Sequence, residues 1–203
     1  GLDRPMTWRR VVRDGLVLLG IVAAVTYWLY LTSGGGAPVD VHYYWAADPH
    51  NLYPHPEAGE GNGYNYSPAF EFVVGWWRGI PFEAFAAIWR AILLAMLVWL
   101  AGPLTLPVML LVPVASEINA ANIQIPLAVA VVLGFRWPAT WAFVVLTKLT
   151  PGIGLLWFLL RREWRKLAIA LGVAAAIAAV SFVLMPDAWF GYVRLLTGEP
   201  APA

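Results

Sequence analysis

Long apolar runs, separated by short polar or proline-containing stretches, dominate this chain of 203 residues. Several of them approach the length of about 20 residues that an α-helix needs to cross a bilayer. Hydrophobic residues make up 61% of the sequence and charged residues 12%, whereas a typical soluble domain carries about 25% charged residues. The sequence therefore predicts an all-α, polytopic bundle of transmembrane helices that forms a single membrane-embedded domain. The predicted membrane segments are Leu16–Leu31, Phe82–Leu100, Met109–Val114, Ile123–Leu133, Trp141–Leu160 and Leu167–Leu184.

Basic residues gather in two clusters, which precede the first and the last of these runs. Arg and Lys concentrate in the cytoplasmic loops of membrane proteins, so both clusters are expected on the inner side of a cell membrane. The first run then carries residues 33–67 to the extracytoplasmic face. The two clusters are Arg4, Arg9, Arg10 and Arg13, and Arg161, Arg162, Arg165 and Lys166.

Prolines interrupt the middle of the chain and predict short or re-entrant helices. Pro103, Pro107 and Pro113 lie close together, and each proline removes a helical hydrogen bond that lipid cannot replace. Two arrangements are open for the run that contains Lys148. Residues 138–160 form either two short helices that meet near Lys148 or one straight helix that buries it. A lone lysine at the bilayer centre costs about 3 kcal/mol, so we favour the two short helices.

Residues 33–67 are expected to form an acidic outer loop. The segment contains Asp40, three further acidic residues and all three histidines of the chain, but no Lys or Arg. Asp40 comes soon after the first run and is our candidate for a general base; the alternative is a solvated loop carboxylate. His42, two residues further on, could orient this carboxylate or an acceptor. The spacing of His42, His50 and His55 matches no metal-binding motif, so we expect no metal site.

Other polar residues lie within or beside the apolar runs, where ionisable groups often mark functional sites. Lys148 could bind a phosphate or only extend its ammonium to the membrane surface. Asn122 and Gln124 could bind a ligand or hydrogen-bond between helices. Glu71 could line a cavity or pair with a cation, and Tyr66 could stack on a sugar or belong to the aromatic belt. An acid, amides and a cation suit a sugar phosphate. No nucleotide-binding motif is present, which favours a lipid-carried donor and no cofactor.

Four short motifs follow one another along the chain. An aspartate precedes a run of aromatics, a Tyr-x-Pro element opens the second apolar run, two amides follow Ala121, and a Lys-x-x-Pro element precedes an aromatic and basic stretch. They are Asp40–Trp45, Tyr66–Pro68, Ala121–Gln124 and Lys148–Pro151, the last followed by Trp157 and Arg161–Arg165. In this order they resemble the polyprenyl-phosphate-mannose-dependent mannosyltransferases of the GT-C superfamily, glycosyltransferase family 87. Members of that family often carry glycine where Ala121 stands, and they are longer, so the chain resembles their N-terminal half.

The resemblance implies a GT-C-like fold and transfer of a hexose, with mannose as the expected sugar, from a polyprenyl phosphate to a lipid-linked glycan of the cell envelope. Asp40 is then expected to be the catalytic base of an inverting displacement. The alternative is a non-catalytic subunit that binds or transports a lipid-linked glycan, in which Asp40 would be dispensable. A missing C-terminal half or a partner subunit could complete the acceptor site. The expected substrate-binding residues are Lys148, Asn122, Gln124, His42, Tyr44, Tyr66 and Glu71.

Overall fold

The protein is a helical membrane bundle, as the sequence predicts. The computed structural model describes residues 8–53, 63–148 and 150–197, and all the secondary structure within these ranges is helical. Three stretches in these ranges are long and apolar enough to cross a membrane, and they coincide with the first, second and last predicted runs. Their long helices are α1 (Trp8–Tyr30), α4 (Phe82–Ala101) and α10 (Trp164–Leu184), and the stretches themselves are Trp8–Gly35, Phe82–Met109 and Trp164–Leu184.

The proline-containing region is broken into short helices, which confirms that prediction. Pro103 and Pro113 each lie in the first turn of a helix, where the missing N–H of proline costs no hydrogen bond. After Ala121 the chain starts another helix, and the two helices on either side of this break could form one span only as a bent pair. The elements are η4 (Gly102–Leu104), α5 (Thr105–Met109), α6 (Val112–Ala120) and α7 (Gln124–Gly134).

The chain also breaks at Lys148, as the favoured arrangement requires. Lys148 has an extended backbone, with φ −140° and ψ 125°, and therefore cannot continue the helix before it. The stretch consists of short helices rather than one straight span. They are η5 (Pro138–Thr140), α8 (Trp141–Thr147), η6 (Thr150–Leu155) and α9 (Leu156–Leu160).

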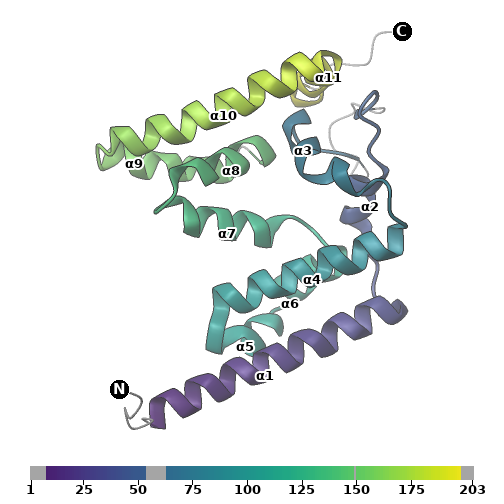
Figure 1. Cartoon of the computed structure of the whole chain (residues 1–203), viewed down its shortest axis with the longest axis vertical. Coiled ribbons are helices and arrows are strands. Elements are labelled where there is room, and N and C mark those ends of the chain that lie inside the picture. The colour runs from purple at the N-terminus through teal and green to yellow at the C-terminus, as the bar shows by residue number, and fades with distance from the viewer. Residues whose placement is uncertain (1–7, 54–62, 149, 198–203) are drawn as a thin grey trace. The chain divides into compact units, whose positions relative to one another are not determined.

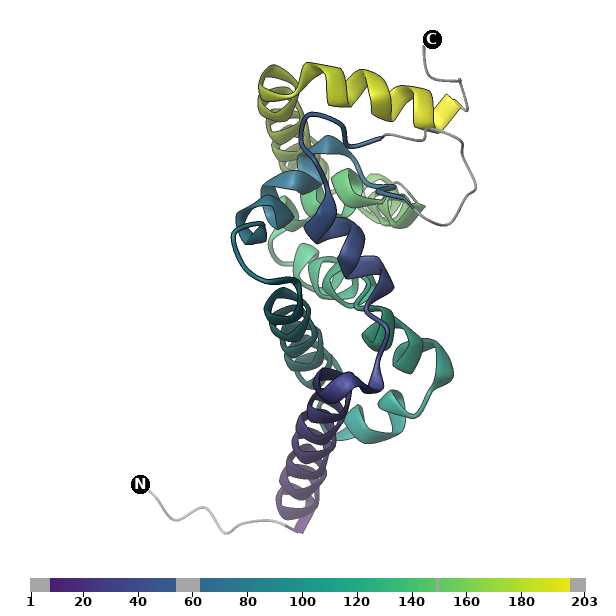
Figure 2. The same cartoon turned by 90° about the vertical axis from the view of Figure 1, so that its right-hand side faces the viewer.

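Two further helices, α2 and α11, form where no helix was predicted. The segment predicted as an outer loop contains α2 (Val39–Ala46), an eight-residue helix that begins just after Pro38. Beyond Met185 the chain forms α11, which turns away from the axis of α10 (Figure 2). Asp187 in its first turn and Arg194 in its last turn complement the helix dipole. The remaining elements are η1 (Leu31–Gly35), η2 (Pro68–Phe70), α3 (Glu71–Val74), η3 (Gly75–Trp77) and α11 (Pro186–Thr197).

The chain divides into two compact units, and the first contains the described residues of 1–41 and 81–126. In this unit α1 packs on α4, η4 and α5 (Figure 1). Gly20 and Ala24, one helical turn apart, are the buried residues of α1. A Cβ atom at Gly20 would lie 2.7 Å from the Cβ of Thr105. Small residues therefore let these helices approach closely, as is common in membrane bundles.

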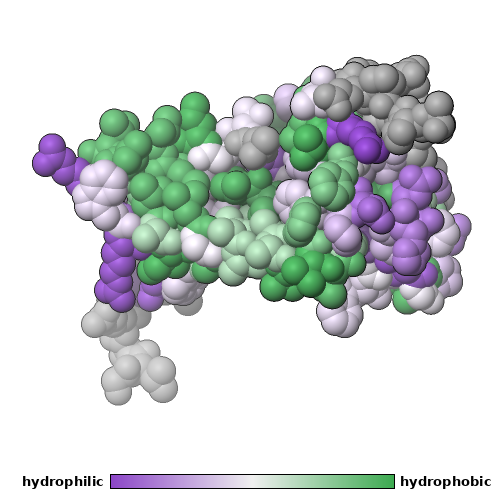
Figure 3. Space-filling view, turned by 90° about the horizontal axis from the view of Figure 1, so that it is seen from above, coloured by the Kyte–Doolittle hydropathy of each residue, from purple (hydrophilic) through white to green (hydrophobic). Residues whose placement is uncertain are grey.

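The second unit contains the described residues of 42–80 and 127–203. Its longest helix, α10, packs on α8, α9, η2, η5 and α11. Trp141 of α8 is 1% exposed and lies against the backbone of Gly134 and Gly154, with Phe135 and Phe158 at its ring edges. Figure 3 looks down on α10 and shows apolar side chains gathered over this helix. Exposed apolar residues on a helix of this length fit contact with lipid rather than water.

Candidate functional site

Asp40 lies in the first turn of α2, shortly after α1 ends. The chain leaves α1 through Gly34, whose φ of 99° favours glycine. The Asp40 side chain is half-buried. An acidic residue in the first turn of a helix complements the positive end of the helix dipole. The structure thus places the predicted base at the beginning of a helix rather than in an irregular loop.

Arg90 is the main residue near this segment that the sequence analysis missed. Its side chain is 3% exposed on α4. Its Nη1 donates to the carbonyl oxygen of Leu31 at 3.1 Å, and its Nη2 donates to that of Asn119 at 2.6 Å. The side-chain oxygen of Asn119 in turn accepts a hydrogen bond from the Ala37 N–H at 3.1 Å. Arg90 lies in the middle of the apolar run 82–100, whose other charged residue is Glu83 at its start, and this position was the signal that could have identified Arg90.

The amide motif lies at the turn between α6 and α7. Ala121 is fully buried and has left-handed backbone angles, φ 59° and ψ 43°. The indole N–H of Trp89 donates to the Ala121 carbonyl at 2.9 Å. The Asn122 side-chain oxygen accepts from the Ile123 N–H at 2.6 Å, so this amide stabilises the turn. The Gln124 side chain is exposed at the start of α7. Gln124 is therefore the freer of the two predicted amides to contact a ligand.

Lys148 lies beside a buried cluster of tyrosines in the second unit. Its Nζ is 5.8 Å from the centre of the Tyr66 ring, a cation–π distance. The hydroxyls of Tyr66 and Tyr44 are 2.9 Å apart, and both rings are buried. The Tyr53 hydroxyl donates to the Tyr66 carbonyl oxygen at 2.5 Å. Burial raises the pKa of Tyr53. It also raises the pKa of Tyr64, which is the more deeply buried of the two.

Glu71 is held in an internal ion pair. It is 6% exposed, and its Oε1 accepts from the Arg78 guanidinium, whose Nε donates to the Ala47 carbonyl at 2.9 Å. The structure therefore agrees with the second interpretation of Glu71, a carboxylate paired with a cation. His42 is exposed on α2 and lies near the rings of Tyr43 and Trp45.

The predicted site residues are distributed over both units. Asp40, Asn122 and Gln124 belong to the first unit, whereas His42, Tyr44, Tyr66, Glu71 and Lys148 belong to the second. Among the histidines and the other acidic residues of the segment 33–67, His55, Glu57 and Glu60 lie outside the described residues, and His50 is exposed. In the described part of the chain, no three His, Asp or Glu side chains gather as a metal site would require.

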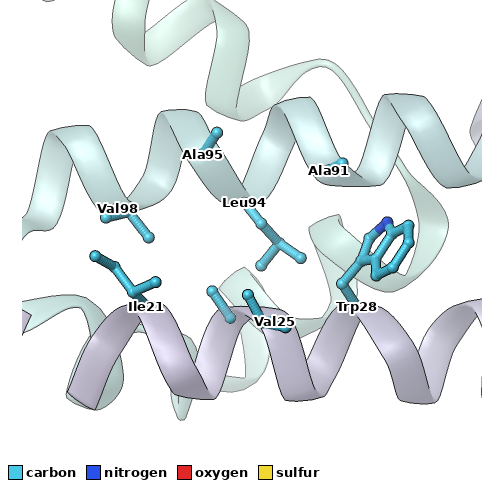
Figure 4. Close-up of a pocket in the computed structure, with 8 residues that line it drawn as sticks. Ile21, Val25, Trp28, Ala91, Leu94, Ala95 and Val98 are labelled. Carbon is cyan, nitrogen blue, oxygen red and sulfur yellow. The ribbon is translucent and has the colours of Figure 1, made fainter. Parts of the chain in front are cut away.

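An apolar groove runs along the first unit between α1 and α4 (Figure 4). Its volume is about 520 Å³, and all of its lining side chains are hydrophobic. The indole N–H of Trp28 is already bonded to the Ala87 carbonyl at 2.8 Å. Such a groove suits a hydrocarbon chain, because its lining presents no hydrogen-bonding side chain that a sugar could use. It is lined by Ile21, Ala24, Val25, Trp28, Ala91, Leu94, Ala95 and Val98.

The family model for glycosyltransferase family 87 matches residues 64–201, which is more than half of the chain. The chain belongs to glycosyltransferase family 87. Membership in this family indicates glycosyl transfer as the activity, carried out by a membrane protein. The matched residues include three of the four motifs, Tyr66–Pro68, Ala121–Gln124 and Lys148–Pro151, whereas Asp40 precedes them. No curated protein and no solved structure matches the chain.

Proposed function

We propose that this family 87 protein transfers a hexose from a polyprenyl phosphate to a lipid-linked glycan, at the extracytoplasmic face of the cell membrane. Membrane-length apolar helices support a donor and an acceptor that both reside in lipid. The clusters of basic residues before the first and last spans support the outward orientation of α2. The choice of mannose rests on the resemblance to mannose-transferring members of the superfamily.

The observation that carries the proposal is the position of Asp40, half-buried in the first turn of a helix that directly follows a membrane span. In the proposed reaction an acceptor hydroxyl oxygen attacks the anomeric carbon, and the bond from that carbon to the phosphate oxygen breaks. The hydroxyl proton passes to Asp40, and polyprenyl phosphate departs with the bonding electrons. The configuration at the anomeric carbon is inverted. General-base catalysis of this kind contributes about 100- to 10,000-fold in rate.

Lys148 is proposed to bind the phosphate of the donor. A cation on extended backbone between two short helices can turn its ammonium toward a ligand without unwinding a helix. Stabilising the negative charge that develops on a leaving group is among the largest contributions to catalysis. We assign Gln124 and His42 to substrate contacts because their side chains are exposed. The side chains of four other predicted residues make hydrogen bonds or an ion pair inside the protein, and we propose that they hold the local structure rather than contact substrate. They are Asn122, Tyr44, Tyr66 and Glu71.

The test compares Asp40→Asn with Asp187→Asn in the full chain reconstituted in nanodiscs. Asp187 is also an acid in the first turn of a helix and is exposed, so it controls for loss of helix-dipole stabilisation. Transfer of radiolabelled mannose from polyprenyl-phosphate mannose to a membrane lipid extract should fall at least about 100-fold in Asp40→Asn and should stay unchanged in Asp187→Asn. Undiminished transfer in Asp40→Asn would remove Asp40 from the mechanism. Donor binding without any transfer by the parent chain would favour the non-catalytic alternative.

A further inference from the structure

Arg90 is a buried cation inside a membrane-spanning stretch. It lies on α4 within Phe82–Met109, and 3% of its side chain is exposed. An arginine within a membrane helix is costly unless hydrogen bonds satisfy its donors. Its Nη1 and Nη2 both donate to main-chain carbonyls, whereas Nε has no partner in the described part of the chain. Because burying a guanidinium in a membrane helix costs free energy, we expect Arg90 to have a structural or functional role.

The two carbonyls that Arg90 binds come from the ends of two different helices. Leu31 begins η1, the short helix that ends the stretch Trp8–Gly35, and Asn119 lies in the last turn of α6. Carbonyl groups at the C-terminal end of a helix lack partners within the helix and carry partial negative charge. A guanidinium bound to both satisfies these carbonyls and complements both dipoles. Arg90 therefore ties the end of α1 to the end of α6.

The same contacts continue into the segment that carries Asp40. The Asn119 side-chain oxygen accepts from the Ala37 N–H at 3.1 Å, and the Ala37 carbonyl accepts from the Val39 N–H at 2.9 Å. The main chain also passes very close to the guanidinium. A Cβ atom at Gly36 would lie 2.6 Å from Nη2 of Arg90 and 2.8 Å from the Asn119 side-chain oxygen. The start of α2 is thus fixed on a frame built from Arg90 and Asn119.

We propose that Arg90 is a positioning residue for Asp40. It acts through the Asn119 main chain, the Asn119 amide and the Gly36–Ala37 backbone, and has no contact with substrate. This inference rests on the proposed function, in which Asp40 is the base. Catalytic groups lose activity steeply when they are displaced by about 1 Å, so loosening this frame should lower turnover while leaving donor binding largely intact.

The positional half of the proposal is tested with spin labels, because the chain contains no cysteine of its own. Labels at Val39→Cys and Trp99→Cys occupy positions that are 50% and 56% exposed. Both positions lie in the first unit. We expect one narrow distance distribution in the parent full chain in nanodiscs and a broad one in Arg90→Gln. Arg136→Gln is the matched control, since Arg136 is exposed and its guanidinium stacks on the ring of Trp137; it should keep the narrow distribution.

Asn119 variants test the last link of the frame, even where Arg90→Gln fails to fold. Asn119→Leu keeps the main-chain carbonyl for Arg90 but removes the acceptor for Ala37, whereas Asn119→Asp keeps an acceptor oxygen. Asn119→Leu should broaden the distribution and lower kcat about 10- to 100-fold, with the KM for polyprenyl-phosphate mannose nearly unchanged. Asn119→Asp should keep the narrow distance distribution and the parental kcat.

Two results would overturn the inference. One is a distribution that stays narrow in both Arg90→Gln and Asn119→Leu. The other is a broad distribution with parental turnover in Asn119→Leu. Failure of the proposed function itself is a different outcome, because it would appear as undiminished turnover in Asp40→Asn. The label distances would then still show whether Arg90 fixes the start of α2.

Discussion

The ammonium of Lys148 lies 5.8 Å from the centre of the Tyr66 ring, at the point where the chain breaks between α8 and η6. The ring is itself fixed, because its hydroxyl bonds that of Tyr44 and its main-chain carbonyl accepts from Tyr53. Two of the four motifs, Tyr-x-Pro and Lys-x-x-Pro, therefore meet in space although they are about 80 residues apart in sequence. A contact of this kind holds the ammonium in a defined place.

Lys148→Met should raise the KM for polyprenyl-phosphate mannose by about 10- to 100-fold, since a hydrogen bond to a charged group contributes about 1.5–3 kcal/mol. Steady-state kinetics in nanodiscs measures the effect. Lys166→Met is the control, because the Lys166 ammonium lies 5.6 Å from the Phe158 ring in a similar cation–π contact. Unchanged donor KM in Lys148→Met would contradict the phosphate-binding role.

The buried tyrosines predict loss of stability at alkaline pH. Burial raises the pKa of Tyr53, Tyr64 and Tyr192, whereas a tyrosine in the unfolded chain ionises near its ordinary pKa of about 10. A raised pKa in the folded state means that the stabilisation is complete below pH of about 10 and falls as the pH rises toward the folded-state pKa. Thermal unfolding in detergent should show this decline when it is followed from about pH 8 to about pH 12, a range that brackets the ordinary tyrosine pKa of about 10.

Phenylalanine variants show whether these phenols cause the alkaline decline. Phenylalanine cannot ionise, so Tyr53→Phe and Tyr64→Phe should each make the decline shallower. The difference in phenolate absorbance between the parent and each variant reports on the phenol that the variant lacks, and it should appear together with unfolding rather than before it. Early appearance of this difference in the folded protein, with no change in stability, would contradict the prediction.

The left-handed backbone of Ala121 predicts that glycine is tolerated at this position without loss of stability. Its left-handed backbone, φ 59°, costs a non-glycine residue about 1–2 kcal/mol. Ala121→Gly removes this strain but also a buried methyl group worth about 0.8 kcal/mol, so the melting temperature should rise slightly or stay the same. Arg162 also has a positive φ, 58°, and is exposed. Arg162→Gly should therefore stabilise more than Ala121→Gly. A loss of stability in Ala121→Gly as large as the missing methyl group alone predicts, about 0.8 kcal/mol, would show that the Ala121 backbone is not strained.

Hydropathy and proline placement were sufficient to predict the fold class, because lipid requires every spanning backbone to satisfy its own hydrogen bonds. The break at Lys148 followed from the cost of a buried lysine. The short helix α2 was not predicted, since eight residues between polar stretches carry little periodic signal. Arg90 was missed because its importance comes from the ends of α1 and α6, which only the tertiary structure brings to it. That Asp40 and Lys148 act on one substrate stays a prediction.

The packing of the second unit around Trp141 requires a glycine at position 134. The backbone of Gly134 touches the indole of Trp141 so closely that an added Cβ atom would overlap the ring. Trp141 is 1% exposed and has no room to move away. Gly134→Ala should therefore destabilise the protein by about 1–3 kcal/mol, the usual range for overpacking. Thermal unfolding in detergent measures the loss.

Gly172 on α10 is the matched control, because an added Cβ atom there would meet no atom within 4 Å. Alanine restricts the unfolded chain more than glycine and suits a helix interior, so Gly172→Ala should stabilise by about 0.4–1 kcal/mol. The two substitutions add the same methyl group and differ only in what that group meets. Equal effects of the same sign would show that contact with Trp141 does not limit residue 134.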